Sequence, residues 1–150
     1  MTVGQPAPAF ELYDQDRNPV SLESLKGSKT LVVFMPFPYT GNCDNEVCTI
    51  RDNLSALNEM DANVVIITVH SIPTTKKWAD ENGLTFPVLS DYWPHGETAK
   101  AYGAFNDTVG AANRYTFVLD AEGVVREVIN TESLKIVREF DAYVDALARI

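Results

Sequence analysis

The sequence is poor in basic residues and in long apolar segments, and each shortage excludes a class of protein. Lys and Arg total 12 against 21 Asp and Glu, which gives a formal net charge of -9. A surface with that charge repels phosphate backbones and anionic lipid, so we expect neither nucleic acid nor a membrane as a partner. Apolar runs such as residues 31–34 and 64–67 are far shorter than the roughly 20 residues of a spanning helix.

Cysteine is also scarce, with only two residues in the chain. Two cysteines make a poor disulfide framework for a secreted domain of 150 residues. Residues 1–9 contain neither the basic cluster nor the apolar stretch of a secretion signal, so we expect a cytoplasmic protein. In that compartment a close cysteine pair is more typical of redox or metal chemistry.

The apolar content is sufficient for one compact core. Hydrophobic residues make up 45% of the 150 positions, and no linker or repeat divides them, which predicts a single domain over residues 1–150. Continuous apolar runs predict central strands at residues 31–35 and 63–69. Shorter patterns predict a hairpin of strands 10–13 and 20–22, a strand at 86–89, and a second hairpin of strands 115–119 and 124–129.

Helical periodicity separates these strands. We expect helices over residues 73–82, ended by Gly83, over residues 97–102, and from about Ser133 with an apolar stripe at Val137, Phe140, Val144 and Leu147. Strands and helices alternate and are followed by a hairpin and a last helix. This order predicts a mixed central sheet flanked by helices, with an N-terminal hairpin, in a thioredoxin-like α/β fold.

Both cysteines lie in one stretch, residues 31–51, which reads LVVFMPFPYTGNCDNEVCTIR. Prolines end the strand at Pro36, and Thr40, Gly41 or Asn42 can cap the helix that follows. The helix has its apolar stripe at positions three or four apart, namely Val47, Ile50, Leu54 and Leu57. On that helix Cys43 falls on the core-facing side of the first turn, whereas Cys48 lies in line with polar residues, nearer solvent.

The position of Cys43 favours reactivity. Unpaired N–H groups and the helix dipole at a helix N-terminus stabilise a thiolate, which is the nucleophilic form of cysteine. The alternative is a small buried residue without chemistry. Cys48 lies five residues on, about 8–9 Å away between Cα atoms in an intact helix, which is too far for a disulfide. Either the first turn unwinds to form the bond, or Cys48 is a bystander.

The loop Pro36-x-x-x-Thr40-x-x-Cys43 resembles the signature loop of the peroxiredoxins, thiol peroxidases of the thioredoxin fold. The resemblance covers essentially the whole chain and includes Glu46, residues 83–91 (GLTFPVLSD) and residues 112–118 (ANRYTFV). Residues 90–96 (SDYWPHG) are most similar to the alkyl hydroperoxide reductase E class, which often uses one cysteine. A second cysteine five residues after the first instead resembles the bacterioferritin comigratory, or Q-type, branch, in which it resolves the sulfenic acid.

The resemblance implies a role for each matching residue. Cys43 is the peroxidatic nucleophile, Thr40 orients the peroxide and the thiolate, and Arg114 stabilises charge at sulfur and oxygen. Pro36 shields the thiolate, and Glu46 holds Arg114. Cys48 is the resolving cysteine, after which an external thiol, either thioredoxin, a glutaredoxin-like protein or a low-molecular-weight thiol, reopens the disulfide. The substrate is hydrogen peroxide or an organic hydroperoxide, and no cofactor is implied.

The local sequence is also consistent with purely structural roles for the same residues. Thr40 could be a plain N-cap, and Glu46 with Arg114 an ordinary ion pair. Asp44, where many relatives carry proline or threonine, should oppose thiolate formation at Cys43.

The sequence offers weaker support for other functions. His70 and His95 lack zinc-site spacing, so we expect no metal. A thioredoxin-type disulfide exchanger normally uses Cys-x-x-Cys, and a non-catalytic redox sensor would not turn over. Exposed aromatic residues near the site favour a homodimer, through Phe37, Tyr39, Tyr92 and Trp93.

Overall fold

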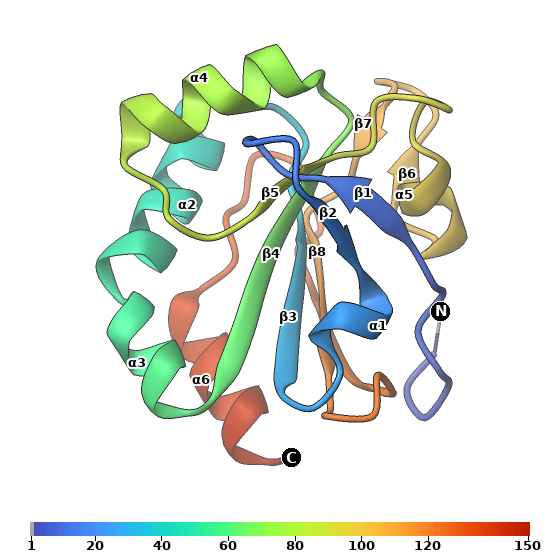
Figure 1. Ribbon diagram of the computed structural model, residues 1–150, viewed down its shortest axis with the longest axis vertical. Helices are drawn as coiled ribbons and strands as arrows, with labels where there is room; N and C mark the ends of the chain where they lie inside the picture. The colour runs from blue at the N-terminus through green and yellow to red at the C-terminus, as the bar shows by residue number, and fades with distance from the viewer. Residues whose placement is uncertain (1) are drawn as a thin grey trace.

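A seven-stranded mixed sheet forms the centre of the molecule (Figure 1). The computed structural model describes residues 2–150, the side chain of Cys43 excepted. The strand order is β2-β1-β5-β4-β3-β8-β9. The bounds are β1 Glu11–Tyr13, β2 Pro19–Ser21, β3 Lys29–Phe34, β4 Ala62–Thr68, β5 Val88–Ser90, β8 Tyr115–Leu119 and β9 Val125–Asn130. A small second sheet pairs β6 (Phe105–Asn106) with β7 (Ala111–Ala112).

Helices cover both faces of the large sheet. In Figure 1, α2 (Gly41–Asp52), α3 (Leu54–Glu59), α4 (Ile72–Asn82) and α6 (Phe140–Ala148) lie to the left of the strands or above them. The short helices α1 (Leu22–Leu25) and α5 (Glu97–Ala101) lie to the right. The predicted sheet flanked by helices is confirmed, as is the N-terminal hairpin, because β1 and β2 pair antiparallel.

The central strand β3 contributes alternate residues to two cores. Leu31 and Val33 pack with the α2, α3, α4 and α6 side, whereas Val32 and Phe34 pack with α1 and α5. All four side chains are fully buried. β3 runs parallel to β4 and antiparallel to β8. Residues 31–34 are covered on both faces of the sheet, which explains the continuous apolar run in the sequence.

The helix after the cysteine loop is shorter than predicted. It ends at Asp52, and Asn53 leaves the helical conformation with φ -115° and ψ 18° before α3 begins. The Asn53 side-chain amide donates to the carbonyl of Thr49 at 2.8 Å. Asparagine side chains compete in this way with backbone pairing. The prediction of one continuous helix through Leu57 is therefore wrong, although α3 continues the same apolar stripe.

The last helix also begins later than predicted, at Phe140 rather than near Ser133. A helix over residues 133–138 would pair the Leu134 carbonyl with the Arg138 N–H, four residues on. The Leu134 carbonyl instead accepts from the Arg114 side chain, and the Arg138 N–H donates to the Glu46 carboxylate at 2.7 Å. Long-range partners thus take both groups, and the segment stays non-helical. Within residues 2–150, no helix is long and apolar enough to cross a membrane.

Candidate active site

The loop between β3 and α2 carries the first predicted site residues. Pro36 is buried, and the Met35 N–H before it still pairs with Ile67 of β4 at 3.0 Å. Thr40 stands at the N-cap position of α2, but its side chain makes no capping bond. Its hydroxyl donates instead to the Phe37 carbonyl at 2.8 Å. The hydroxyl proton is therefore used inside the loop, and the oxygen can still accept a hydrogen bond.

Cys43 lies in the first turn of α2, as predicted. The Asp44 N–H closes this turn on the Thr40 carbonyl at 2.9 Å. The Cys43 side chain lies outside the described residues. Its predicted core-facing direction, its thiolate character and its pairing with Cys48 therefore stay predictions.

Glu46 lies one turn after Cys43 and forms the centre of a buried ionic cluster. Its Oε1 accepts a hydrogen bond from Arg114, so the predicted contact between these two residues is confirmed. A second guanidinium, that of Arg138, donates to both carboxylate oxygens, from Nε at 2.9 Å and from Nη2 at 2.9 Å. Glu46, Arg114 and Arg138 are 6%, 3% and 6% exposed. One carboxylate thus holds two buried cations.

The charge state of Glu46 follows from this arrangement. Burial by itself raises the pKa of the carboxyl, but the hydrogen bonds and charge of Arg138, with the charge of Arg114, outweigh it and lower the pKa overall. Glu46 is therefore ionised at neutral pH. The Glu46 carboxylate is thus shared by two permanently charged guanidinium groups, which it holds beside α2.

Arg138 was missed at the sequence level. It lies 92 positions after Glu46, and its neighbours Val137 and Phe140 mimic a helical stripe. Its Nη1 also donates to Thr116 of β8 at 3.1 Å, so the side chain spans from α2 to the sheet. The predicted helix from about Ser133 had its apolar stripe at Val137 and Phe140, and nothing in that pattern marked Arg138 as a buried residue.

Asp44 does not face the solvent freely beside Cys43. Its Oδ1 accepts the Tyr39 backbone N–H at 3.2 Å and the Trp78 indole N–H at 2.7 Å. Trp78 belongs to α4 and is fully buried. Tyr39 has a left-handed backbone, with φ 69°. One oxygen therefore links the loop, the first turn of α2 and α4.

Cys48 is less exposed than predicted. Its side chain is half-buried and packs against the core on the helix side of the sheet. Its Sγ donates to Oδ1 of Asn82 in α4 at 3.5 Å, and the neighbouring Arg51 donates to the Asn82 carbonyl at 2.7 Å. Cys48 was predicted nearer solvent than the apolar stripe, and it is half-buried where Val47 and Ile50 are buried, but α4 covers part of that side of α2.

The two histidines each contact a group that is not a metal ligand. His70 packs edge-on against Phe37, with ring centroids 6.2 Å apart, and His95 contacts the Gly110 carbonyl at 2.8 Å. Burial, with a smaller effect of His95, lowers the pKa of His70. Among the described residues, no three His, Cys, Asp or Glu side chains are placed to hold a metal ion.

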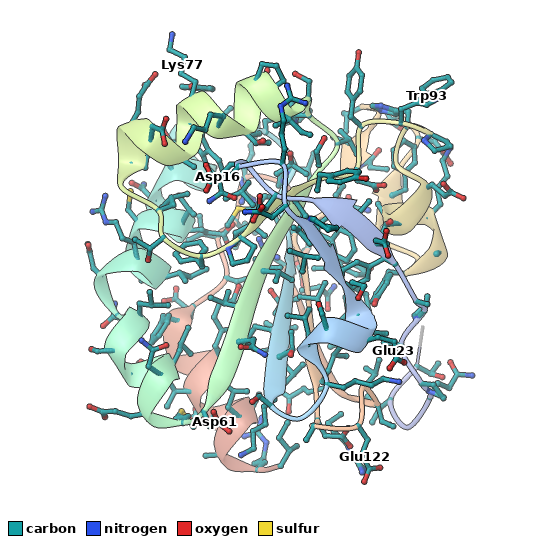
Figure 2. All side chains as sticks on the ribbon, viewed as in Figure 1. Asp16, Glu23, Asp61, Lys77, Trp93 and Glu122 are labelled. Carbon is teal, nitrogen blue, oxygen red and sulfur yellow. The ribbon has the colours of Figure 1, made fainter. Side chains whose placement is uncertain are left out.

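Four aromatic residues were expected near the site. Tyr39, Tyr92 and Trp93 are 47%, 54% and 83% exposed, whereas Phe37 is half-buried. Figure 2 shows Trp93 at the upper right, projecting away from the ribbon. Tyr92 and Trp93 also line a groove of about 350 Å³ with Tyr13, Ile72 and Pro73, among others.

Comparison with known proteins agrees with this arrangement. A model of the AhpC/TSA family matches residues 3–128. Alkyl hydroperoxide reductase E of Mycobacterium tuberculosis is 42% identical over 151 residues, which cover 100% of this chain and 98% of that protein. The chloroplastic peroxiredoxin Q of Sedum lineare is 35% identical over 133 residues, covering 88% and 70%.

Solved structures lead to the same family. The crystal structure of peroxidoxin BcpB from Mycobacterium tuberculosis matches with a TM-score of 0.85 at 31% identity and covers 99% of this chain and 95% of that one. Enterococcus faecalis AhpC matches with a TM-score of 0.89 at 25% identity and covers 98% and 90%. The resemblance inferred from the cysteine loop is confirmed. The chain belongs to the AhpC/TSA family and is a peroxiredoxin with a thioredoxin-like fold.

Proposed function

We propose that this peroxiredoxin is a thiol-dependent peroxidase in which Cys43 attacks the peroxide. The observation that carries the proposal is the buried pair of Glu46 and Arg114 beside the first turn of α2. Residues three apart on a helix share a face, so Glu46 brings Arg114 to the side of α2 that carries Cys43. A permanent cation is held there without solvent to screen it.

The chemistry is a two-electron oxidation of sulfur. The Cys43 thiolate attacks the distal peroxide oxygen, the O–O bond breaks, and the other oxygen leaves as alkoxide or hydroxide, which takes a proton to become alcohol or water. Sulfur becomes a sulfenic acid. Arg114 stabilises the negative charge as it moves from sulfur to the leaving oxygen. Thr40, whose proton is bound to Phe37, accepts the peroxide O–H and so orients the substrate.

Peroxide consumption with a thiol reductant tests this assignment. Cys43→Ser is expected to abolish turnover, and Arg114→Lys to slow the reaction by about 10- to 100-fold because a point charge replaces a planar, hydrogen-bonded guanidinium. Cys48→Ser is the matched cysteine control and keeps the first oxidation step. If Cys43→Ser retained peroxidase activity, the assignment would be wrong.

We further propose that Cys48 resolves the sulfenic acid. The Cys48 thiol attacks the Cys43 sulfur, water leaves, and an intramolecular disulfide remains; an external dithiol, or two monothiols, reduces it. Both cysteines lie in α2, five residues apart, so the helix start must unwind first. Peroxide should remove two hydrogens from the wild-type mass, whereas Cys48→Ser should gain oxygen at Cys43. Oxygen gain without disulfide in the wild type would instead indicate a one-cysteine cycle.

We also propose a homodimer through the groove lined by Tyr13, Tyr92 and Trp93. Exposed aromatic side chains gathered at one end of a protein commonly mark a contact surface. Trp93, at 83% exposure, is the natural anchor. Analytical ultracentrifugation at micromolar concentration should give a dimer for the wild type and a monomer for Trp93→Glu. A wild-type monomer would contradict this part of the proposal.

A further inference from the structure

Three polar contacts join α2, which follows the loop of residues 36–40, to the C-terminal half of α4. Asp44 contacts Trp78, and Cys48 and Arg51 both contact Asn82. Figure 1 shows α4 crossing the upper part of the molecule beside α2. Any unwinding of the first turn of α2 must break the nearest of these contacts, the one between Asp44 and Trp78.

We infer that the Asp44 carboxylate is a positioning group that keeps the Cys43 loop in its peroxide-reactive form, and that its bond to the Trp78 indole must break before Cys48 reaches Cys43. This inference rests on the peroxidase cycle proposed above. Asp44 acts through its neighbours and does not touch the peroxide.

Asp44 holds the loop before Thr40 in its observed conformation. Tyr39 has a left-handed backbone, which non-glycine residues rarely adopt without a compensating contact. Its N–H donates to Asp44, and the Asp44 N–H in turn donates to the Thr40 carbonyl. These two bonds close the chain on either side of Thr40. They fix the backbone of Thr40, whose hydroxyl is proposed above to orient the peroxide.

Asp44 also satisfies the buried indole N–H of Trp78. Trp78 has no exposed surface, and its Nε1–H can only donate. Asp44 accepts it at 2.7 Å. If the first turn unwinds and Asp44 moves away, a buried donor loses its partner, which is strongly unfavourable. The contact therefore opposes the opening that resolution requires, and its loss should speed resolution by about tenfold or more.

Replacing Asp44 by asparagine distinguishes the effect of its hydrogen bonds from the effect of its charge. Both donors meet the same oxygen, Oδ1, which has two lone pairs. An asparagine amide oxygen can accept both bonds without the negative charge. Asp44→Asn should therefore keep the positioning effect, whereas Asp44→Ala should lose it.

The test measures two rates in each variant: oxidation of Cys43 by peroxide, and formation of the disulfide with Cys48, both followed by rapid quench and intact mass. Asp44→Ala should slow oxidation about tenfold and speed disulfide formation about tenfold. Asp44→Asn should form the disulfide at the wild-type rate and oxidise at or above it. Trp78→Phe should speed disulfide formation while oxidation changes less, because the Tyr39 bond remains.

Glu59→Ala is the matched control, since it removes an exposed carboxylate from α3, the helix that follows α2. It should leave both rates unchanged. A spectroscopic signature completes the test: in a Trp93→Phe background, Trp78 is the only tryptophan of the chain. Its emission should change together with disulfide formation, and Asp44→Ala should abolish most of that change.

The measured rates distinguish a failure of the proposed peroxidase function from a failure of the role inferred for Asp44. If the wild type does not reduce peroxide, the proposed function fails; if it oxidises but forms no disulfide, only the resolving role of Cys48 fails and the oxidation rates still test Asp44. The inference is overturned if Asp44→Ala leaves a folded protein with unchanged rates. It is also overturned if Asp44→Asn slows oxidation as much as Asp44→Ala, or if Trp78→Phe resolves at the wild-type rate.

Discussion

The buried cluster around Glu46 should dominate the stability of the helix that carries Cys43. Glu46→Gln keeps the size of the side chain and an acceptor oxygen but removes the charge that Arg114 and Arg138 share. Two guanidinium groups, each under 7% exposed, would then lose the carboxylate charge that both of them contact. Breaking a buried ion pair by removing one partner costs about 3–5 kcal/mol.

The lower end of that range applies to Glu46→Gln, because the amide oxygen still accepts one guanidinium N–H. We therefore expect a loss of about 3 kcal/mol in the free energy of unfolding. For a chain of this length, that corresponds to a decrease in Tm of roughly 6–12 °C. Urea denaturation followed by circular dichroism measures the free energy, and differential scanning calorimetry measures Tm.

The pH dependence gives an independent check. Glu46 has a lowered pKa in the folded protein, so below the ordinary value of 4.5 the unfolded chain binds a proton that the folded one does not. Its contribution to stability is therefore present above that value and is lost as pH falls through the folded pKa. The difference between wild type and Glu46→Gln should accordingly shrink on acidification.

Glu59→Gln is the matched control, since Glu59 is an exposed residue of α3. It should change the free energy of unfolding by less than about 0.5 kcal/mol. The reasoning is refuted if Glu46→Gln unfolds within that same margin of wild type at pH 7, or if its deficit does not depend on pH.

Two further changes test other parts of the molecule. Arg138→Lys should lower the rate of peroxide reduction by about tenfold at unchanged secondary structure, because one ammonium cannot reach both Glu46 and Thr116. A stopped-flow rate equal to that of the wild type would show that Arg138 does not support the site. Gly83→Ala should lower the free energy of unfolding in urea by about 1 kcal/mol, because the φ of Gly83 is 63°. Gly41→Ala, at a residue outside the left-handed region, should not lower it. Equal effects of the two substitutions would contradict this prediction.

Local patterns were sufficient for most of the fold. The apolar runs predicted β3 and β4 within one or two residues, since the middle of a strand buried on both faces is apolar at consecutive positions. Gly83 marked the end of α4 because its left-handed backbone is a property of the residue itself. The pairing of Glu46 with Arg114 came from the family resemblance and not from any local pattern.

What the sequence did not reveal depends on distant partners. The segment before Phe140 has a helical pattern, but the bonds that would make it a helix go to Arg114 and Glu46. Cys48 was placed toward solvent because a helical stripe identifies only one buried side. The contact of α2 with Asn82 buries a second side, and nothing in residues 41–52 signals it.

The 92-residue separation between Glu46 and Arg138 also concerns protein synthesis. On the ribosome the reactive helix emerges well before Arg138, and long-range contacts form only after the later residue appears. We therefore expect Cys43 to react slowly with peroxide until Arg138 has left the ribosome. Arrested chains that carry a C-terminal linker long enough to expose residue 138 should react faster with peroxide than chains arrested without one.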